Sequence, residues 1–189
     1  MTNDGPEAWR IAYAGNVAAH QFLTAALLPL LDKGAKAAPG HTSVVVNVAS
    51  VAGLTKTHSQ GQFAYSSSKA ALLHLTREWA HAFMGLSIRV NCIAPGLFPS
   101  EMSTGWSDEN QKSWLGDAGK KFPAGELFFL QGLVWVYSFA DGVAGRVGRE
   151  SDIGSVVLYL CSRAGTYVNG QVIHVDGGED ISFCGLSVC

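Results

Sequence analysis

The stretch Thr42-Ser43-Val44-Val45-Val46-Asn47-Val48-Ala49-Ser50 says most about the fold. Its β-branched residues run together without a clean alternation of apolar and polar positions. This pattern is typical of a strand covered on both faces, as in a parallel sheet. Apolar residues at helical spacing precede it from Glu7 to Leu31, and a second helix is predicted from Tyr65 to Phe83. A further strand over Leu86–Ile93 ends before Pro95-Gly96, so helix and strand alternate and predict an α/β fold.

The C-terminal third continues this alternation. A helix is predicted to begin at Ser151 or Asp152, either of which can cap it, and a closing strand covers Gln171–Val175. The region between, Ser100–Gly148, is long, irregular and rich in glycine. We expect residues 1–189 to form a single domain that ends in a tail, residues 179–189.

Composition excludes several classes of function. The chain has 13 Lys plus Arg against 15 Asp plus Glu, and no basic cluster of the kind that binds phosphates, so no nucleic-acid partner is expected. The N-terminus is acidic and has no secretory pattern, which predicts a cytoplasmic protein. The most apolar run, Leu127–Phe139, is shorter than the roughly 20 residues of a membrane-spanning helix, so no membrane partner is expected. The cysteines and histidines lack metal-ligand spacing, and Cys92 and Cys161 are interpreted as core residues.

The candidate site lies where strands end. Ser50 ends the first strand, and the backbone at Pro95-Gly96 follows the second; ligands of open α/β sheets bind at such carboxyl ends. Tyr65 and Lys69 stand one helical turn apart on one face. A pair with this spacing is commonly just two surface neighbours, but its combination with Ser50 and Pro95-Gly96, each at the correct end of its element, indicates a site.

Tyr65 and Lys69 make chemical sense as a proton-transfer pair. A phenol has an ordinary pKa near 10, and a neighbouring ammonium lowers it by stabilising the phenolate. The Ser50 hydroxyl can hold a carbonyl oxygen beside the phenol. Proton delivery to oxygen is half of a carbonyl reduction, and the hydride of the other half has to come from a cofactor.

The same residues resemble the short-chain dehydrogenase/reductase family over most of the chain. The matching stretches are Trp9–Leu31, Val45–Ser50, Tyr65-Ser66-Ser67-Ser68-Lys69-Ala70-Ala71, Arg89–Gly96 and Asn169–Gly178. The stretch Pro95–Met102 is similar to fungal members related to 3-oxoacyl carrier-protein reductases. The resemblance implies a Rossmann-type three-layer α/β/α fold with a mostly parallel sheet. It also implies NAD(P)-dependent hydride transfer between nicotinamide and a small carbonyl or alcohol substrate.

The resemblance further implies roles for individual residues. Tyr65 is the proton donor and acceptor, Ser50 orients the carbonyl, and Lys69 binds the nicotinamide ribose and tunes Tyr65. Asn16 anchors a proton-relay water. The implied catalytic set is therefore Asn16, Ser50, Tyr65 and Lys69, and the implied cofactor-binding set is Asn16, Tyr65, Lys69, Pro95, Gly96, Leu97, Phe98 and Ser100. The helices that carry Asn16 and Tyr65 are expected to assemble a homodimer or homotetramer.

The sequence departs from the family at its beginning. Members open with a strand, a TGxxxGxG turn and two further βα units, and none of these is present, so only the nicotinamide half of an NADP or NAD site is expected. The glycine turn matters because its backbone approaches the pyrophosphate at a helix N-terminus. The alternative is an inactive, truncated remnant that acts only through oligomerisation. In either case an apolar sheet edge would be exposed, which predicts poor solubility or obligate association.

A second departure is internal. The family pattern runs from a segment like Phe122–Gly125 almost directly into Arg146, whereas residues 126–145 intervene here and are unusually apolar and aromatic. Two explanations stay open: a substrate-loop extension that forms a hydrophobic lid, or a translated intron, favoured by the abrupt change in composition. Sequencing mature transcripts distinguishes the two.

Overall fold

The structure is a computed structural model that describes residues 4–37, 39–55, 61–100, 107–109, 112–113, 127–130, 133–136 and 146–178. The chain divides into two compact units. One consists of Met1–Pro95 with Ile153–His174, and the other of Gly96–Asp152 with Val175–Cys189.

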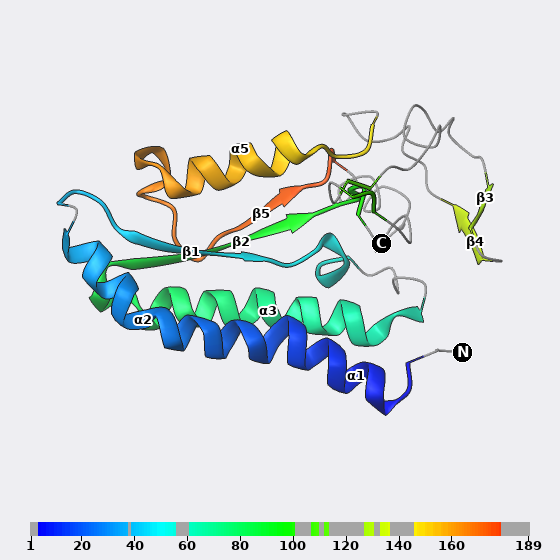
Figure 1. Cartoon of the computed structure of the whole chain (residues 1–189), viewed down its shortest axis with the longest axis horizontal. Coiled ribbons are helices and arrows are strands. Elements are labelled where there is room, and N and C mark those ends of the chain that lie inside the picture. Colours follow the sequence, from blue (N-terminus) through cyan, green and yellow to red (C-terminus); the bar gives the residue numbers. More distant parts are fainter. Residues whose placement is uncertain are drawn as a thin grey trace, which may run out of the picture. The chain divides into compact units, whose positions relative to one another are not determined.

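A three-stranded sheet with the order β1-β2-β5 forms the centre of the fold (Figure 1). Its strands are β1 (Ser43–Val48), β2 (Ile88–Pro95) and β5 (Val172–Val175). β1 and β2 are parallel, with Ser43 opposite Ile88 and Val48 opposite Ile93. The strands β2 and β5 also run in the same direction (Figure 1). The prediction of a parallel sheet is therefore confirmed, and β1 lies at its edge.

Helices cover both faces of this sheet (Figure 1). On one face lie α1 (Pro6–Tyr13), a π-helical turn (Ala14–Ala18) and α2 (Ala19–Ala37), which form one continuous helical run, together with α3 (Phe63–Ala82). On the other face lies α5 (Glu150–Cys161). The predicted three-layer α/β/α architecture is confirmed.

Several helix boundaries differ from prediction; α3, for example, covers Phe63–Ala82 rather than Tyr65–Phe83. The first helical run continues past Leu31 to Ala37, where an ion pair one turn apart, Lys36 Nζ to Asp32 Oδ2 at 2.6 Å, supports the last turns. α5 begins at Glu150, so neither Ser151 nor Asp152 precedes it as a cap. Asp152 lies in the first turn, where its Oδ2 accepts a hydrogen bond from the Arg149 N–H at 2.8 Å.

β2 lies in the core, because its residues from Ile88 to Ala94 are all buried. Leu72 and Leu73 of α3 pack with Ala49 and Cys92, while Trp79 and Ala80 pack with Val90. The prediction that Cys92 is a core residue is confirmed. It is wrong for Cys161, which is exposed at the end of α5.

Arg89 is the one arginine of β2, and its side chain is only 6% exposed. Its guanidinium donates to the carbonyl oxygens of Leu160, Gly165 and Val168 at 2.8, 2.8 and 3.1 Å. Its Nε donates to Thr42 Oγ1 at 2.5 Å. A cation at the C-terminus of α5 satisfies carbonyls that helical hydrogen bonding leaves over. Arg89 therefore ties β2 to the end of α5.

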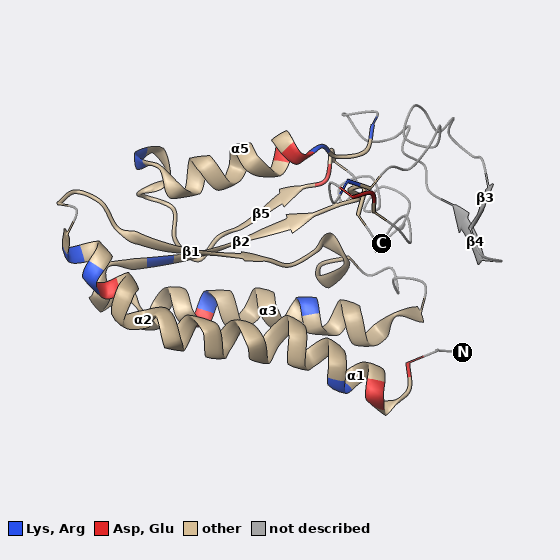
Figure 2. Cartoon of the chain, viewed as in Figure 1, with Lys and Arg blue, Asp and Glu red and all other residues tan. Residues whose placement is uncertain are grey.

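The helical run Pro6–Ala37 is long and apolar enough, by length and composition alone, to cross a membrane. Figure 2 shows that charged residues on it are confined to its two ends. In the structure this run packs along α3 (Figure 1) and forms polar contacts with it: Gln21 Oε1 accepts from Trp79 Nε1 at 2.9 Å. In the structure the helical run is therefore part of the folded α/β domain, where it packs on α3.

The second unit contains β3 (Leu127–Leu130) and β4 (Leu133–Val136), which pair antiparallel. Both strands fall inside the apolar insertion, residues 126–145, and the rest of that insertion lies outside the described residues. The predicted tail, residues 179–189, also lies outside them.

Near the start of α5, Arg146 binds Asp152 through two nitrogens, at 2.7 and 3.1 Å, and this lowers the Asp152 pKa to about 2.

Candidate functional site

Tyr65 and Lys69 lie on the first and second turns of α3, with their side chains together. Lys69 Nζ is 5.7 Å from the centroid of the Tyr65 ring, within the range of a cation–π contact. Both side chains are half-buried. The spacing in the sequence is thus realised as a contact between the two side chains.

Lys69 is also bound to the end of β1. Its Nζ donates to the Val48 carbonyl oxygen at 3.0 Å. Burial lowers the pKa of Lys69, because a charged ammonium is less well solvated there than in water. An ammonium has three N–H donors, so two remain after the Val48 contact for the hydroxyls of a ligand.

Ser50 follows β1 in an extended conformation, with φ −170° and ψ 154°. Its Oγ accepts a hydrogen bond from the Ala52 N–H at 3.1 Å and thereby caps the 3₁₀ turn Val51–Gly53. Because Oγ acts there as an acceptor, the hydroxyl hydrogen can still donate to a substrate oxygen.

Gly53 sets how closely the Ser50 turn approaches α3. A Cβ at this position would lie 2.7 Å from the Ala70 backbone nitrogen and 2.8 Å from the Lys69 carbonyl carbon. No real Cβ comes so close to backbone atoms, so glycine is required for this packing. The turn that carries Ser50 therefore rests directly on the helix that carries Tyr65 and Lys69.

Gly53→Ala is expected to push this turn away from α3, destabilising the protein by about 1–3 kcal/mol. A displacement of about 1 Å at a reacting group can lower a rate about 100-fold, so turnover should fall at least tenfold. Urea unfolding and steady-state rates check both effects. The matched control is Gly154→Ala in α5, where a Cβ meets no atom within 4 Å, and it should stabilise by about 0.5–1 kcal/mol. Equal behaviour of the two variants would contradict the prediction.

Asn16 lies in the π-helical turn Ala14–Ala18, a local widening of a helix that is frequent at functional sites. Its Nδ2 donates to Ser68 Oγ at 3.0 Å, and Ser68 Oγ donates to the Tyr65 carbonyl oxygen at 2.7 Å. Ser68 is fully buried. Asn16 is thus joined to α3 through the residue next to Lys69, and the sequence contained no signal for Ser68 in this role.

His20 is a further residue beside the site, one turn after Asn16. Burial lowers the pKa of the His20 imidazole, and the positive charge of Lys69 lowers it further. The sequence did not indicate His20 as a residue of this site. The neighbour that affects its pKa, Lys69, is distant along the chain. Both effects favour the neutral form of the imidazole.

This pKa shift predicts a pH dependence of stability. Since the folded-state pKa of His20 lies below its unfolded value of about 6.5, the unfolded chain binds the proton more readily. Stability should therefore decline as the pH falls below about 6.5. His20→Gln removes this group. The unfolding free energy of the variant should therefore decline less between pH 7 and pH 5 than that of the wild type. Parallel declines in the two proteins, measured by urea unfolding, would show that His20 contributes nothing.

The predicted cofactor-binding residues after β2 fall in different units. Pro95 ends β2 in the first unit, whereas Gly96, Leu97, Phe98 and Ser100 belong to the second. Within the second unit, the Gly96 N–H donates to the Val175 carbonyl and the Gly148 N–H donates to the Leu97 carbonyl, both at 3.0 Å. The Phe98 ring packs on Gly148, where a Cβ would lie 2.2 Å from it. These backbone hydrogen bonds and this ring contact help to hold the loop in place.

Comparison with known proteins relates this geometry to a family. Residues 2–111 match the family model described as short chain dehydrogenase, and residues 136–179 match that described as Enoyl-(Acyl carrier protein) reductase. The chain is 32% identical to the short-chain dehydrogenase/reductase PhomF of Diaporthe leptostromiformis over 92% of its own length and 53% of that protein. It is 31% identical to dehydrogenase/reductase SDR family member 4 of Mus musculus, over 91% of its own length and 51% of that protein.

Solved structures agree with the sequence comparison. The Pseudomonas aeruginosa RhlG/NADP active-site complex superposes with a TM-score of 0.71 and 30% identity, covering 95% of this chain and 61% of that one. The chain thus spans about half the length of the curated relatives it matches.

Proposed function

The chain belongs to the short-chain dehydrogenase family, and from this membership we propose that it is an NAD(P)-dependent oxidoreductase. The proposed reaction is reversible hydride transfer between nicotinamide and a small carbonyl or alcohol substrate. The observation that carries the proposal is the pairing of Tyr65 with Lys69, whose Nζ lies 5.7 Å from the phenol ring.

The proposed chemistry of the chain's own residues is a proton transfer. The Tyr65 hydroxyl gives its proton to the carbonyl oxygen during reduction and takes it back during oxidation. Lys69 stabilises the phenolate that remains, because a positive charge beside it favours the ionised form. The Ser50 hydroxyl donates to the same substrate oxygen and holds it beside Tyr65. The nicotinamide, when bound, supplies the hydride.

The proposed cofactor is NADP or NAD, held by its nicotinamide half. Lys69 and Tyr65 have donors for the ribose hydroxyls, and the glycine at position 96 leaves the backbone accessible to a flat ring. Leu97, Phe98 and Ser100 would contact the carboxamide, next to Pro95. Asn16 is proposed to act from the π-helical turn through the network that joins it to Tyr65.

Cofactor titration tests this function directly. NADPH and NADH are titrated into the protein and followed by cofactor fluorescence, and we expect saturable binding by at least one of them. Lys69→Met should weaken binding at least tenfold, because it removes the ammonium donors. The exposed Lys36→Met serves as the matched control and should leave binding unchanged. Absence of binding at millimolar cofactor would refute the enzyme proposal for this chain.

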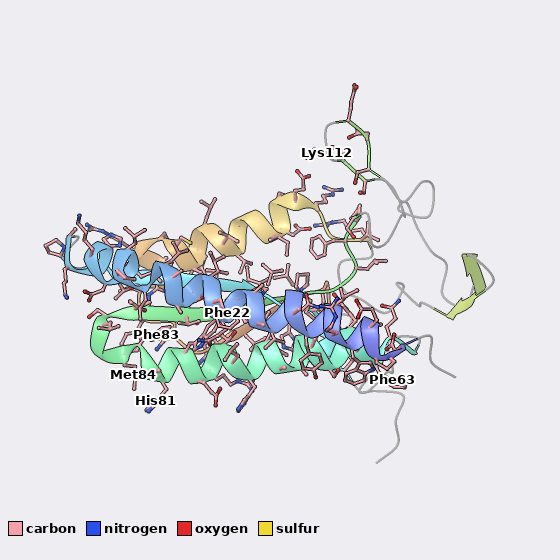
Figure 3. All side chains as sticks on the ribbon, turned by 60° about the horizontal axis from the view of Figure 1, so that its bottom comes forward. Phe22, Phe63, His81, Phe83, Met84 and Lys112 are labelled. Carbon is pink, nitrogen blue, oxygen red and sulfur yellow. The ribbon has the colours of Figure 1, made fainter. Side chains whose placement is uncertain are left out.

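We also propose that the protein forms a homodimer or homotetramer through the helices that carry Asn16 and Tyr65. Phe22, on α2, is 72% exposed, and Met84, just after α3, is 57% exposed (Figure 3). Leu23 and Leu30 of α2 are also largely exposed. Large apolar side chains gathered on one surface typically mark an interface. Phe22→Asp should shift the protein towards monomer in analytical ultracentrifugation, and an unchanged distribution would exclude this surface.

We propose a non-catalytic role as the second candidate, favoured by the large apolar side chains that α2 exposes. In that case the exposed face of α2 would still support association. Loss of cofactor binding together with retained association would favour this role. The cytoplasm is the proposed compartment for either function.

A further inference from the structure

The helical run that carries Asn16 and the helix α3, which carries Tyr65, begin at the same end of their layer (Figure 1). α3 follows Gln62, whose side chain forms no capping hydrogen bond. The first four N–H groups of a helix have no carbonyl partner within that helix, and a local side chain commonly binds one of them. α3 therefore lacks a local cap at the turn in which Tyr65 lies.

Asp4 supplies a cap for α3 from 60 residues away in the sequence. Its Oδ2 accepts a hydrogen bond from the Ala64 N–H at 2.8 Å. Ala64 is only 3% exposed, so its N–H has little access to water and needs a partner in the protein. The helix dipole favours a carboxylate at a helix N-terminus, and hydrogen bonds to charged acceptors are stronger than neutral ones. The contact is therefore an N-cap formed by the tertiary structure.

The helix next to Asp4 in the sequence does not use this carboxylate. α1 begins after Gly5 with Pro6 at its first position, and no side chain caps it. A proline at that position has no N–H, so α1 has one donor fewer to satisfy. Aspartate is among the strongest N-cap residues. Its capping capacity at this point of the chain is thus used by α3.

A second contact from the same segment holds Tyr65 on its other side. The Tyr65 carbonyl accepts a hydrogen bond from Ser68 Oγ at 2.7 Å, and Ser68 Oγ accepts one from Asn16 Nδ2 at 3.0 Å. Asp4 therefore binds the residue before Tyr65, and Asn16 binds Tyr65 through one serine. Together the two contacts fix the backbone from which the phenol projects.

We propose that Asp4 is a positioning residue of the candidate site: its carboxylate caps α3 and thereby holds the turn that presents the Tyr65 hydroxyl to a substrate. The consequence for turnover rests on the proposed function, whereas the cap does not. Because Asp4 acts through the Ala64 N–H, it should affect proton transfer by Tyr65 more than the affinity for cofactor.

Amide hydrogen exchange, followed by NMR on the full chain, tests the cap without cofactor. The Ser66 N–H donates to the Gln62 carbonyl at 3.1 Å and reports opening of the first turn of α3. Asp4→Ala should speed its exchange about five- to thirtyfold, the range that loss of a helix cap produces. Asp4→Asn keeps an acceptor oxygen and should stay within about twofold of wild type. The Phe83 N–H, at the other end of α3, should be unchanged in both variants.

Steady-state kinetics test the positioning. Asp4→Ala should lower kcat at least threefold, because a small displacement of a reacting group slows the reaction, and should leave the KM for cofactor within about twofold. Asp4→Asn should restore kcat. The matched control is Glu7→Ala, which removes a nearby carboxylate whose Oε2 accepts from the exposed Arg10 at 2.8 Å. It should leave both Ser66 exchange and kcat unchanged.

Several results would overturn the proposal. Equal Ser66 exchange in wild type and Asp4→Ala would show that Asp4 does not cap α3, and faster exchange with unchanged kcat would show that the cap does not position Tyr65. Parallel acceleration at Ser66 and Phe83 would indicate a general loss of stability instead of a local one. An inactive wild type whose Ser66 exchange still responds to Asp4→Ala would support the cap and refute the proposed function, so the two failures are distinguishable.

Discussion

Tyr65→Phe is expected to lower turnover by about 100- to 10,000-fold, the usual contribution of a positioned general acid or base. The substitution removes the hydroxyl that we propose as the proton donor and retains the ring, whose centroid lies 5.7 Å from Lys69 Nζ. Cofactor affinity should therefore stay within about threefold of wild type. Steady-state rates and a fluorescence titration of NADPH or NADH check the two halves of this expectation.

Tyr159→Phe is the matched control, since Tyr159 is an exposed tyrosine of α5. It should leave both turnover and cofactor affinity unchanged. Full turnover by Tyr65→Phe would refute the proton-transfer role. A parallel loss of turnover and affinity would assign Tyr65 to binding instead.

Arg89→Met is expected to destabilise the protein by about 3–5 kcal/mol, the largest effect on stability of any substitution considered. The guanidinium donates to the carbonyls of Leu160, Gly165 and Val168 from a buried position. Each buried carbonyl that loses its partner costs about 1–3 kcal/mol, and partial access of water reduces the sum. Urea unfolding followed by circular dichroism measures the difference.

Arg163→Met provides the control, because Arg163 is exposed and its Nε donates to His41 Nε2 at 2.9 Å. It should change stability by no more than about 0.5 kcal/mol. Comparable losses in the two variants would show that the Arg89 network contributes no more than an ordinary surface contact.

Local pattern was sufficient to predict the elements of the fold. The valine run of β1, the helical periodicity before it and the Pro95-Gly96 stop after β2 are properties of neighbouring residues, and the parallel α/β architecture followed from their order. The pairing of Tyr65 with Lys69 was predictable for the same reason, because one helical turn separates them. Boundaries such as Ala37 and Glu150 were not, since helix ends depend on ion pairs and caps that many sequences can supply.

The sequence by itself therefore determined the order and type of the elements in the central sheet and its covering helices, the family and the identity of the candidate catalytic residues, but not the strands β3 and β4. Only the tertiary structure decided how those residues are held: Asn16 by Ser68, Lys69 by the Val48 carbonyl, and the Ser50 turn by the close approach of Gly53 to α3. The physical reason is the separation along the sequence of the residues that interact. Helix and strand preferences are set by near neighbours. Hydrogen bonds such as that from Asn16 to Ser68 join residues 52 positions apart, which only the packed chain brings together.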